Sequence, residues 1–321
     1  MIMKNKRIVY MGTPDFAVMP LSRLVDGGYN VVGVVTVPDK EAGRGRNVTE
    51  SAVKRYAKDK GLPVLQPERL KDETFLASLR EMNPDIIVVV AFRMLPEAVW
   101  SMPSCGTFNL HASLLPLYRG AAPINRAIMN GDTVTGVTTF MLDKQIDTGR
   151  IIMQRSVEIE PDDCAGTLHD KLMVTGADLV IETVDMIEEG GVVTRPQEEV
   201  DDLLRKEAPK IFKDTCLIDW NDTVKHINDH IRGLSPYPAA WSPLGSIAGE
   251  GNTFKIFRAT PVVRAHDYPC GTVLSDMKER LWVAAADGFV AIEELQQSGK
   301  KRVSVSEYLR GARLDGKAVK L

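Results

Sequence analysis

Three short apolar runs in the first third of the sequence restrict the fold that this chain can adopt. Residues 6–11, 30–36 and 85–91 are rich in Val and Ile, and a helical apolar pattern separates the first two runs. Runs without polar alternation are typical of strands that are buried on both faces of a parallel sheet. This β-α-β opening, followed by the most apolar run at 85–91, predicts an α/β, Rossmann-like domain with a mostly parallel sheet.

The glycine-rich fingerprints of nucleotide-binding α/β proteins are missing from this sequence. The first strand is followed by Gly12-Thr13-Pro14-Asp15, without the second and third glycines that let a backbone approach a pyrophosphate. The chain also contains no Gly-Lys-Ser or Gly-Lys-Thr triplet. A nicotinamide-dependent dehydrogenase and a P-loop enzyme are therefore disfavoured.

A change in composition after Gly190 indicates a second domain. The segment from 190 to 209 contains Pro196, Pro209 and four closely spaced acidic residues, which is typical of a linker. A helical pattern at 223–234 and several short β segments follow, as expected for a small, OB-like β-barrel. We therefore expect a catalytic domain at 1–189, a linker at 190–208 and a second domain at 209–321.

Charge is distributed unevenly along the chain, whose net charge is −3. Residues 1–205 hold 29 acidic and 23 basic side chains, whereas residues 206–321 hold 14 acidic and 17 basic ones. A weakly basic second half permits contact with a polyanion such as a nucleic acid.

Other features of the sequence argue against metal, disulfide and membrane chemistry. The four cysteines are widely spaced, with no Cys-x-x-Cys pair, and no apolar run reaches the ~18 to 20 residues that span a bilayer. We therefore expect a cytoplasmic protein without a metal site or a membrane anchor. No obligate protein partner is implied by the sequence.

The stretch at 106–120 carries the strongest functional signal. Residues 107–111 read as a strand, in which Asn109 and His111 point to the same side because side chains alternate. A loop containing Pro and Gly follows at once. The carboxyl ends of parallel strands form the binding crevice of such sheets, so we expect a catalytic pair at this position.

Two further loops contain polar residues of interest. The loop at 143–149 contains Asp147-Thr148-Gly149, a composition that is typical of a turn. The loop at 38–47 combines Gly43 and Gly45 with Arg44 and Arg46, which could close on a phosphate-bearing substrate.

Taken together, Asn109-Leu110-His111, Ser113-Leu114-Leu115-Pro116, Arg119-Gly120 and Asp147-Thr148-Gly149 resemble the signature of the 10-formyltetrahydrofolate-dependent formyltransferases. Further segments resemble the members of this family that act on methionyl-initiator tRNA: Gly12 to Phe16, Ala42 to Arg46, Gly120 to Ile124 and Ile218 to Trp220. The resemblance covers nearly the whole chain.

This resemblance implies a Rossmann-like formyltransferase domain and an OB-like domain that helps to hold tRNA. The family's catalytic Asn, His and Asp fall on Asn109, His111 and Asp147. Its folate-contacting loop falls on Ser113, Leu114, Leu115 and Pro116, and its tRNA-contacting loop on the segment with Arg44 and Arg46. The implied substrates are 10-formyltetrahydrofolate, as formyl donor, and methionyl-initiator tRNA.

One position departs from the family pattern. An aromatic-glycine pair usually follows the central strand, whereas here Phe92 is followed by Arg93. We expect Phe92, Arg93 and Leu95 to line the folate pocket, because they follow the carboxyl end of that strand.

Three other functions are compatible with the same residues. The first is formyl transfer to a small amine, such as a sugar nucleotide or glycinamide ribonucleotide, and the second is hydrolysis of 10-formyltetrahydrofolate. The third is a folate- or nucleotide-binding regulatory module without catalysis. The loop with Arg44 and the basic second half argue against a small acceptor, and the intact Asn, His and Asp set argues against binding alone.

Overall fold

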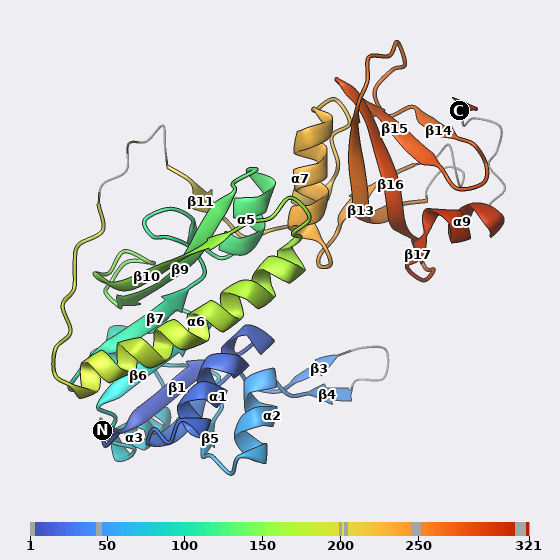
Figure 1. Cartoon of the computed structure of the whole chain (residues 1–321). Coiled ribbons are helices and arrows are strands. Elements are labelled where there is room, and N and C mark those ends of the chain that lie inside the picture. The colour runs from blue at the N-terminus through green and yellow to red at the C-terminus, as the bar shows by residue number, and fades with distance from the viewer. Residues whose placement is uncertain are drawn as a thin grey trace. The chain divides into compact units, whose positions relative to one another are not determined.

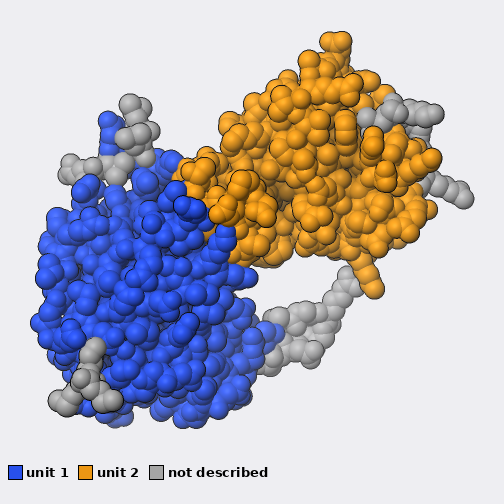
Figure 2. Space-filling model, in the orientation of Figure 1, with its two compact units in different colours: residues 1–120, 134–158, 169–207 blue, residues 121–133, 159–168, 208–321 orange. Residues whose placement is uncertain are grey.

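The computed structural model describes residues 4–42, 47–198, 201, 205–244, 252–311 and 319–320. The chain forms two compact units, which Figure 2 shows in different colours. Unit 1 consists of residues 1–120, 134–158 and 169–207, and unit 2 of residues 121–133, 159–168 and 208–321. The domain boundaries inferred from composition stay a prediction.

Unit 1 is built on a seven-stranded sheet with the order β10-β9-β7-β6-β1-β2-β5 (Figure 1). Neighbouring strands from β7 to β5 run parallel, whereas β9 and β10 are antiparallel additions at one edge. The predicted Rossmann-like, mostly parallel sheet is thereby confirmed. Its strands are β1 (Ile8–Gly12), β2 (Val31–Val35), β5 (Val64–Leu65), β6 (Ile86–Val90), β7 (Thr107–His111), β9 (Val134–Met141) and β10 (Ile151–Glu158).

Helices cover both faces of this sheet. They are α1 (Val18–Asp26), α2 (Ala52–Asp59), α3 (Glu73–Glu81), α4 (Glu97–Trp100) and α6 (Ala165–Glu188), and a short 3₁₀ turn (Asp15–Ala17) leads into α1. Polar side chains fix where two of them begin. Ser51 accepts the backbone N–H of Lys54 at the start of α2, and Asp72 accepts that of Thr74 at the start of α3.

The alternation of side chains along β7 decides which face carries the predicted catalytic pair. Leu110 points toward α6, where a Cβ on Gly176 would lie only 2.8 Å from the Leu110 side chain. On the opposite face, Val89 packs with Leu79 of α3 in a buried cluster. Asn109 is in register with Val89, so Asn109 and His111 lie on the face that α3 covers.

Two short strand pairs lie outside the seven-stranded sheet. Strands β3 (Lys40–Ala42) and β4 (Asn47–Thr49) pair antiparallel on either side of residues 43–46. Strand β8 (Arg119–Gly120) pairs with β11 (Glu207–Ala208). The second pairing attaches part of the predicted linker to the chain segment that follows β7.

Unit 2 contains a second seven-stranded sheet, which is mainly antiparallel. Its strands are β12 (Ala240–Ser242), β13 (Phe254–Val263), β14 (Val273–Ser275), β15 (Leu281–Ala285), β16 (Gly288–Gln297), β17 (Val303–Ser304) and β18 (Val319–Lys320); its helices are α5 (Pro123–Met129), α7 (Val224–Leu234) and α9 (Val305–Gly311). Ile227 and Ile231 of α7 share a buried core with Phe254 and Leu295 of the sheet. A separate β domain in the second half, as predicted, is confirmed.

None of the helices among the described residues combines the length and the apolar character that crossing a bilayer requires.

Candidate active site

The predicted catalytic pair lies at the carboxyl end of β7. The His111 side chain is buried, and its Nε2 atom lies 2.8 Å from the backbone carbonyl oxygen of Tyr118. Tyr118 has a φ angle of +59°, which turns the chain back toward β7 after the loop. Asn109 is half-buried, and within the described part of the chain nothing hydrogen-bonds to its side chain. Its amide is therefore free to donate to a ligand.

The third predicted residue, Asp147, lies beside His111. The Oδ2 atom of Asp147 is 3.9 Å from Nδ1 of His111 and accepts a hydrogen bond of 3.0 Å from the backbone N–H of Gly120. Asp147 has a φ angle of +54°, in the left-handed region that non-glycine residues seldom adopt. The structure thus brings His111 and Asp147 together from segments that are distant in sequence.

The contacts of the imidazole fix its protonation pattern. A backbone carbonyl can only accept a hydrogen bond, so the Nε2 atom of His111 must carry the hydrogen that faces Tyr118. The neutral ring then presents the lone pair of Nδ1 toward the Asp147 carboxylate, which also only accepts. A proton on Nδ1, or a water molecule between the two groups, is required to join them.

The predicted folate-contacting loop is held by internal hydrogen bonds. Ser113 is fully buried and donates its hydroxyl to the carbonyl of Leu117 over 2.7 Å. The backbone N–H of Leu115 donates to the hydroxyl of Thr138, which in turn donates to the carbonyl of Ser113. The Leu115 side chain is buried against Phe140 and Ile151, whereas Leu114 and Pro116 are half-buried. Ser113 and Leu115 thus shape the loop, and their contact with folate stays a prediction.

The three residues after β6 that were predicted to line the folate pocket make different contacts. Leu95 is buried in the cluster beneath α3, and Phe92 packs against that cluster. The Arg93 guanidinium donates to the carbonyls of Pro67 and Glu68 and lies 5.6 Å above the Phe92 ring. Burial lowers the pKa of Arg93 below its usual value. Arg93 therefore joins the exit of β6 to the segment after β5.

The two predicted tRNA contacts, Arg44 and Arg46, lie outside the described residues. They fall in the connection between β3 and β4.

Sequence reasoning missed two side chains that hold the loop with Asp147. The side-chain amide of Gln197 donates to the carbonyl oxygens of Asp147 and Gly149, over 2.8 and 2.9 Å. Arg119 donates from Nε and Nη2 to the Oε1 atom of Gln197, over 3.0 and 2.5 Å. Arg119 stands in the quoted motif, but no sequence signal points to Gln197, which lies in the stretch that composition marks as a linker.

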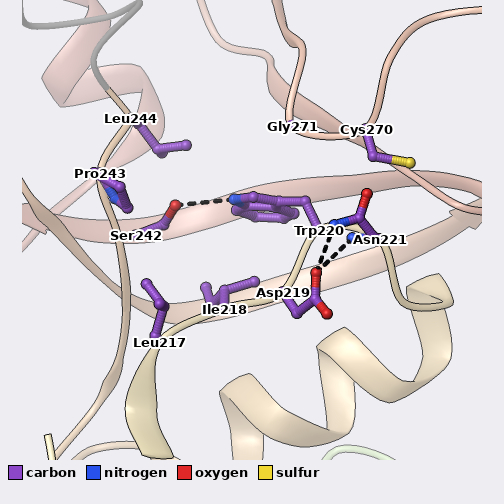
Figure 3. A pocket seen from close by; sticks show the side chains of 10 residues that line it. All are labelled: Leu217, Ile218, Asp219, Trp220, Asn221, Ser242, Pro243, Leu244, Cys270 and Gly271. Carbon is purple, nitrogen blue, oxygen red and sulfur yellow. Dashed lines mark hydrogen bonds between the residues drawn. The ribbon is translucent and has the colours of Figure 1, made fainter. Parts of the chain in front are cut away.

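A cavity of about 480 Å³ lies in unit 2 (Figure 3). The indole N–H of Trp220 donates to the Ser242 hydroxyl at its wall. Asp219 accepts hydrogen bonds from the backbone and the side chain of Asn221, and these contacts lower the pKa of Asp219. No predicted site residue lines this cavity. Among the described residues there is also no group of three His, Cys, Asp or Glu side chains that could hold a metal ion.

Two family models match the chain in succession. The model described as "Formyl transferase" matches residues 6–184, and the model described as "Formyl transferase, C-terminal domain" matches residues 210–313. The first match contains Asn109, His111 and Asp147, and the two together cover most of the sequence.

Curated relatives match along almost their whole length. The methionyl-tRNA formyltransferase of Bacteroides thetaiotaomicron is 58% identical over 97% of this chain and 97% of its own. That of Flavobacterium johnsoniae is 51% identical over 96% of this chain and 97% of its own.

Solved structures share the fold at lower sequence identity. HypX from Aquifex aeolicus, solved with tetrahydrofolic acid, is 20% identical with a TM-score of 0.66; the match covers 98% of this chain and 48% of HypX. An N-formyltransferase from Helicobacter canadensis, solved with folinic acid and dTDP-3-aminofucose, is 19% identical with a TM-score of 0.63, over 92% of this chain and 99% of its own. The match to both formyl transferase models and the high identity to curated relatives lead to one conclusion. The chain belongs to the methionyl-tRNA formyltransferase family.

Proposed function

We propose that this chain transfers the formyl group of 10-formyltetrahydrofolate to the amino group of methionyl-initiator tRNA and so supports translation initiation. One observation favours this function over the alternatives. His111 and Asp147 meet at the carboxyl end of β7, in a chain that matches a relative named for this reaction over 97% of its length. The reaction moves a one-carbon acyl group from a folate nitrogen to a primary amine, and each step needs a side chain in a defined role.

Asn109 is the residue that we assign to the developing negative charge. Attack of the amine on the formyl carbon places charge on the formyl oxygen, and a fixed hydrogen-bond donor stabilises it. The Asn109 amide projects from the same strand face as His111 and has no other partner among the described residues. A donor of this kind contributes about 2.7 to 4 kcal/mol to transition-state stabilisation.

His111 and Asp147 form the proton-handling pair in this scheme. The Nε2 atom of His111 is engaged by Tyr118, so Nδ1 is the ring nitrogen that can donate to the reacting group or to Asp147. When Nδ1 is protonated, the ring becomes a second, stronger donor for the formyl oxygen. The Asp147 carboxylate stabilises the protonated ring and accepts the proton released by the amine, either directly or through water; that proton then passes to the folate nitrogen as its bond to the formyl carbon breaks.

The separation of 3.9 Å between Nδ1 and Oδ2 fits this role in the absence of substrate. It exceeds the length of a direct hydrogen bond, and catalytic hydrogen bonds often tighten only when substrates bind. The buried position of His111 strengthens each electrostatic contact made there.

The folate is assigned to the loop of residues 113–116 and to the residues after β6. Both segments leave the sheet at the carboxyl ends of neighbouring parallel strands, where ligands of such sheets bind. Phe92, Arg93 and Leu95 are proposed to face the folate from one side, and Ser113 to Pro116 from the other.

The tRNA is assigned to Arg44 and Arg46 and to the basic residues of unit 2. Arginine binds phosphate oxygens with a rigid fork of donors, which suits a contact to a nucleic-acid backbone. We expect the protein to act in the cytoplasm, without an obligate protein partner or a metal ion.

A three-arm assay tests the proposed function. The protein is incubated with 10-formyltetrahydrofolate and either methionyl-initiator tRNA, an amino-sugar nucleotide, or buffer alone, and release of tetrahydrofolate is followed. We expect turnover only in the first arm. Turnover in buffer at the same rate points to a hydrolase, turnover with the sugar nucleotide points to a small-molecule transferase, and binding without turnover in any arm points to a regulatory module.

A further inference from the structure

The loop that carries Asp147 needs an external support. It connects β9 to β10, and Asp147 within it holds a left-handed backbone conformation that is unfavourable for a residue with a side chain. On its outer side Asp143 accepts hydrogen bonds from the backbone of Gln145 and the hydroxyl of Thr148. Those contacts do not reach the carbonyl oxygen of Asp147.

Gln197 supplies the missing contacts. Its Nε2 atom donates to the carbonyl oxygens of Asp147 and Gly149, so one amide group spans the turn on both sides of Thr148. On its other side the loop packs closely against the end of β9, because a Cβ at Gly149 would lie 1.7 Å from the carbonyl oxygen of Met141. The loop is therefore held between β9 and the Gln197 side chain.

Arg119 determines the orientation of that side chain. A guanidinium group only donates, so the atom of Gln197 that faces Arg119 must be its oxygen, and the NH₂ group must face the two carbonyls. The flanking residues of Arg119 contact the catalytic pair directly: Tyr118 accepts from His111, and Gly120 donates to Asp147. We call residues 118–120 the strap.

The segment that delivers Gln197 is itself attached to unit 1. Arg195 exchanges two backbone hydrogen bonds with Ile151 at the start of β10, over 2.8 and 2.9 Å. Arg150 donates to the hydroxyl and to the carbonyl of Thr194. Residues 194–197 thus lie along the Asp147 loop as a fixed element.

From these contacts we infer that Gln197, oriented by Arg119, is a positioning residue that sets the placement of Asp147 relative to His111. The inference rests on the proposed catalytic role of Asp147. Gln197 touches neither His111 nor, in our assignment, the substrates, so it acts through the loop backbone alone. Removing its side chain should lower kcat and leave the KM for each substrate close to its original value.

The test uses the full chain and three single substitutions. Gln197→Ala removes both loop contacts, and Gln197→Glu keeps an acceptor for Arg119 while losing the donor to the carbonyls. Gln145→Ala is the matched control, since Gln145 is an exposed residue of the same loop. We expect kcat to fall about 10- to 100-fold in both Gln197 variants, as displacements near 1 Å do, and to stay unchanged in the control.

A double-mutant cycle separates positioning from a general structural role. In an Asp147→Asn background, Gln197→Ala should lower kcat by less than about 2-fold, because the group that it positions is already gone. An equal loss in both backgrounds, or wild-type kcat in Gln197→Ala, overturns the inference. If Asp147→Asn itself retains full turnover, the proposed role of Asp147 fails and the inference fails with it.

Discussion

The backbone N–H of Gly120 donates to the carboxylate of Asp147 over 3.0 Å, although 27 residues separate the two in sequence. The same strap accepts the Nε2 hydrogen of His111 at Tyr118. One short segment thus contacts both members of the proposed proton-handling pair, so small changes around it should be visible in catalysis before they are visible in folding.

Replacement of His111 by alanine should lower turnover by at least about 100-fold, the lower end of what a positioned acid-base group contributes. The fold should persist, because among the described residues the ring makes a single hydrogen bond, to the backbone of Tyr118. Steady-state kinetics with methionyl-initiator tRNA, together with a thermal melt, measure the two effects. Near-normal turnover in a folded variant would remove His111 from its assigned role.

Replacement of Asn109 by alanine should lower kcat by about 10²- to 10³-fold, the usual effect of removing one oxyanion donor. Because the amide has no partner among the described residues, the melting temperature should change little. Asn109→Asp is the informative companion, since it keeps the shape and puts an acceptor where a donor is needed. A kcat for Asn109→Ala within a few-fold of the wild type contradicts the assignment.

Replacement of Arg44 by alanine should raise the KM for charged initiator tRNA more than the KM for the folate. The loss of one phosphate contact should also reduce the dependence of tRNA binding on salt, by close to one unit of slope. Binding measured from 50 to 200 mM salt gives that slope, with Arg46→Ala as the neighbouring comparison. An unchanged tRNA affinity and slope would assign this loop to another purpose.

Unit 2 should lose stability as the pH falls, in part through His230. Burial lowers the pKa of His230, against a hydrogen bond with the Cys216 backbone that raises it, and the buried Nε2 atom has no partner in the described part of the chain. With the folded pKa below the unfolded value of ~6.5, the unfolded state binds the proton more readily. Stability is therefore complete above about pH 7 and declines as acidification passes below ~6.5.

His230→Gln should remove this contribution, whose slope is at most about 1.4 kcal/mol per pH unit for one proton. Denaturant unfolding of both proteins at pH 7.5, 6.5 and 5.5 measures it. His226→Gln is the matched control, since His226 is exposed on the same helix and pairs with Asp222. Parallel pH curves for the wild type and His230→Gln would contradict the prediction.

Patterns of period two and of unbroken apolar runs were sufficient to predict the architecture of unit 1. The run at 85–91 became β6 at the centre of the sheet, and the expected strand at 107–111 became β7 beside it. These features could be predicted because burial on one or both faces leaves a local mark in the sequence.

The contacts that hold the candidate site in place could not be predicted from such a pattern in the sequence. Gln197 lies 50 residues from Asp147, in a stretch whose prolines and acidic residues are typical of a linker. The left-handed backbone of Asp147 is compatible with Asp-Thr-Gly but not required by it. Arg93 was predicted to line the folate pocket because it follows β6. Its hydrogen bonds to the carbonyls of Pro67 and Glu68 could not be predicted, because they depend on how two loops pack together.

The attachment of residues 194–197 along β10 suggests where a fragment of this chain that contains the candidate active site should end. The match to the formyl transferase model stops at residue 184, before Gln197. A shortened protein that stops at residue 189 would contain Asn109, His111 and Asp147 and still lack the amide that steadies the last of them. Extending such a fragment to residue 198 restores that amide, so transplantation or fusion of the catalytic half should keep these few residues.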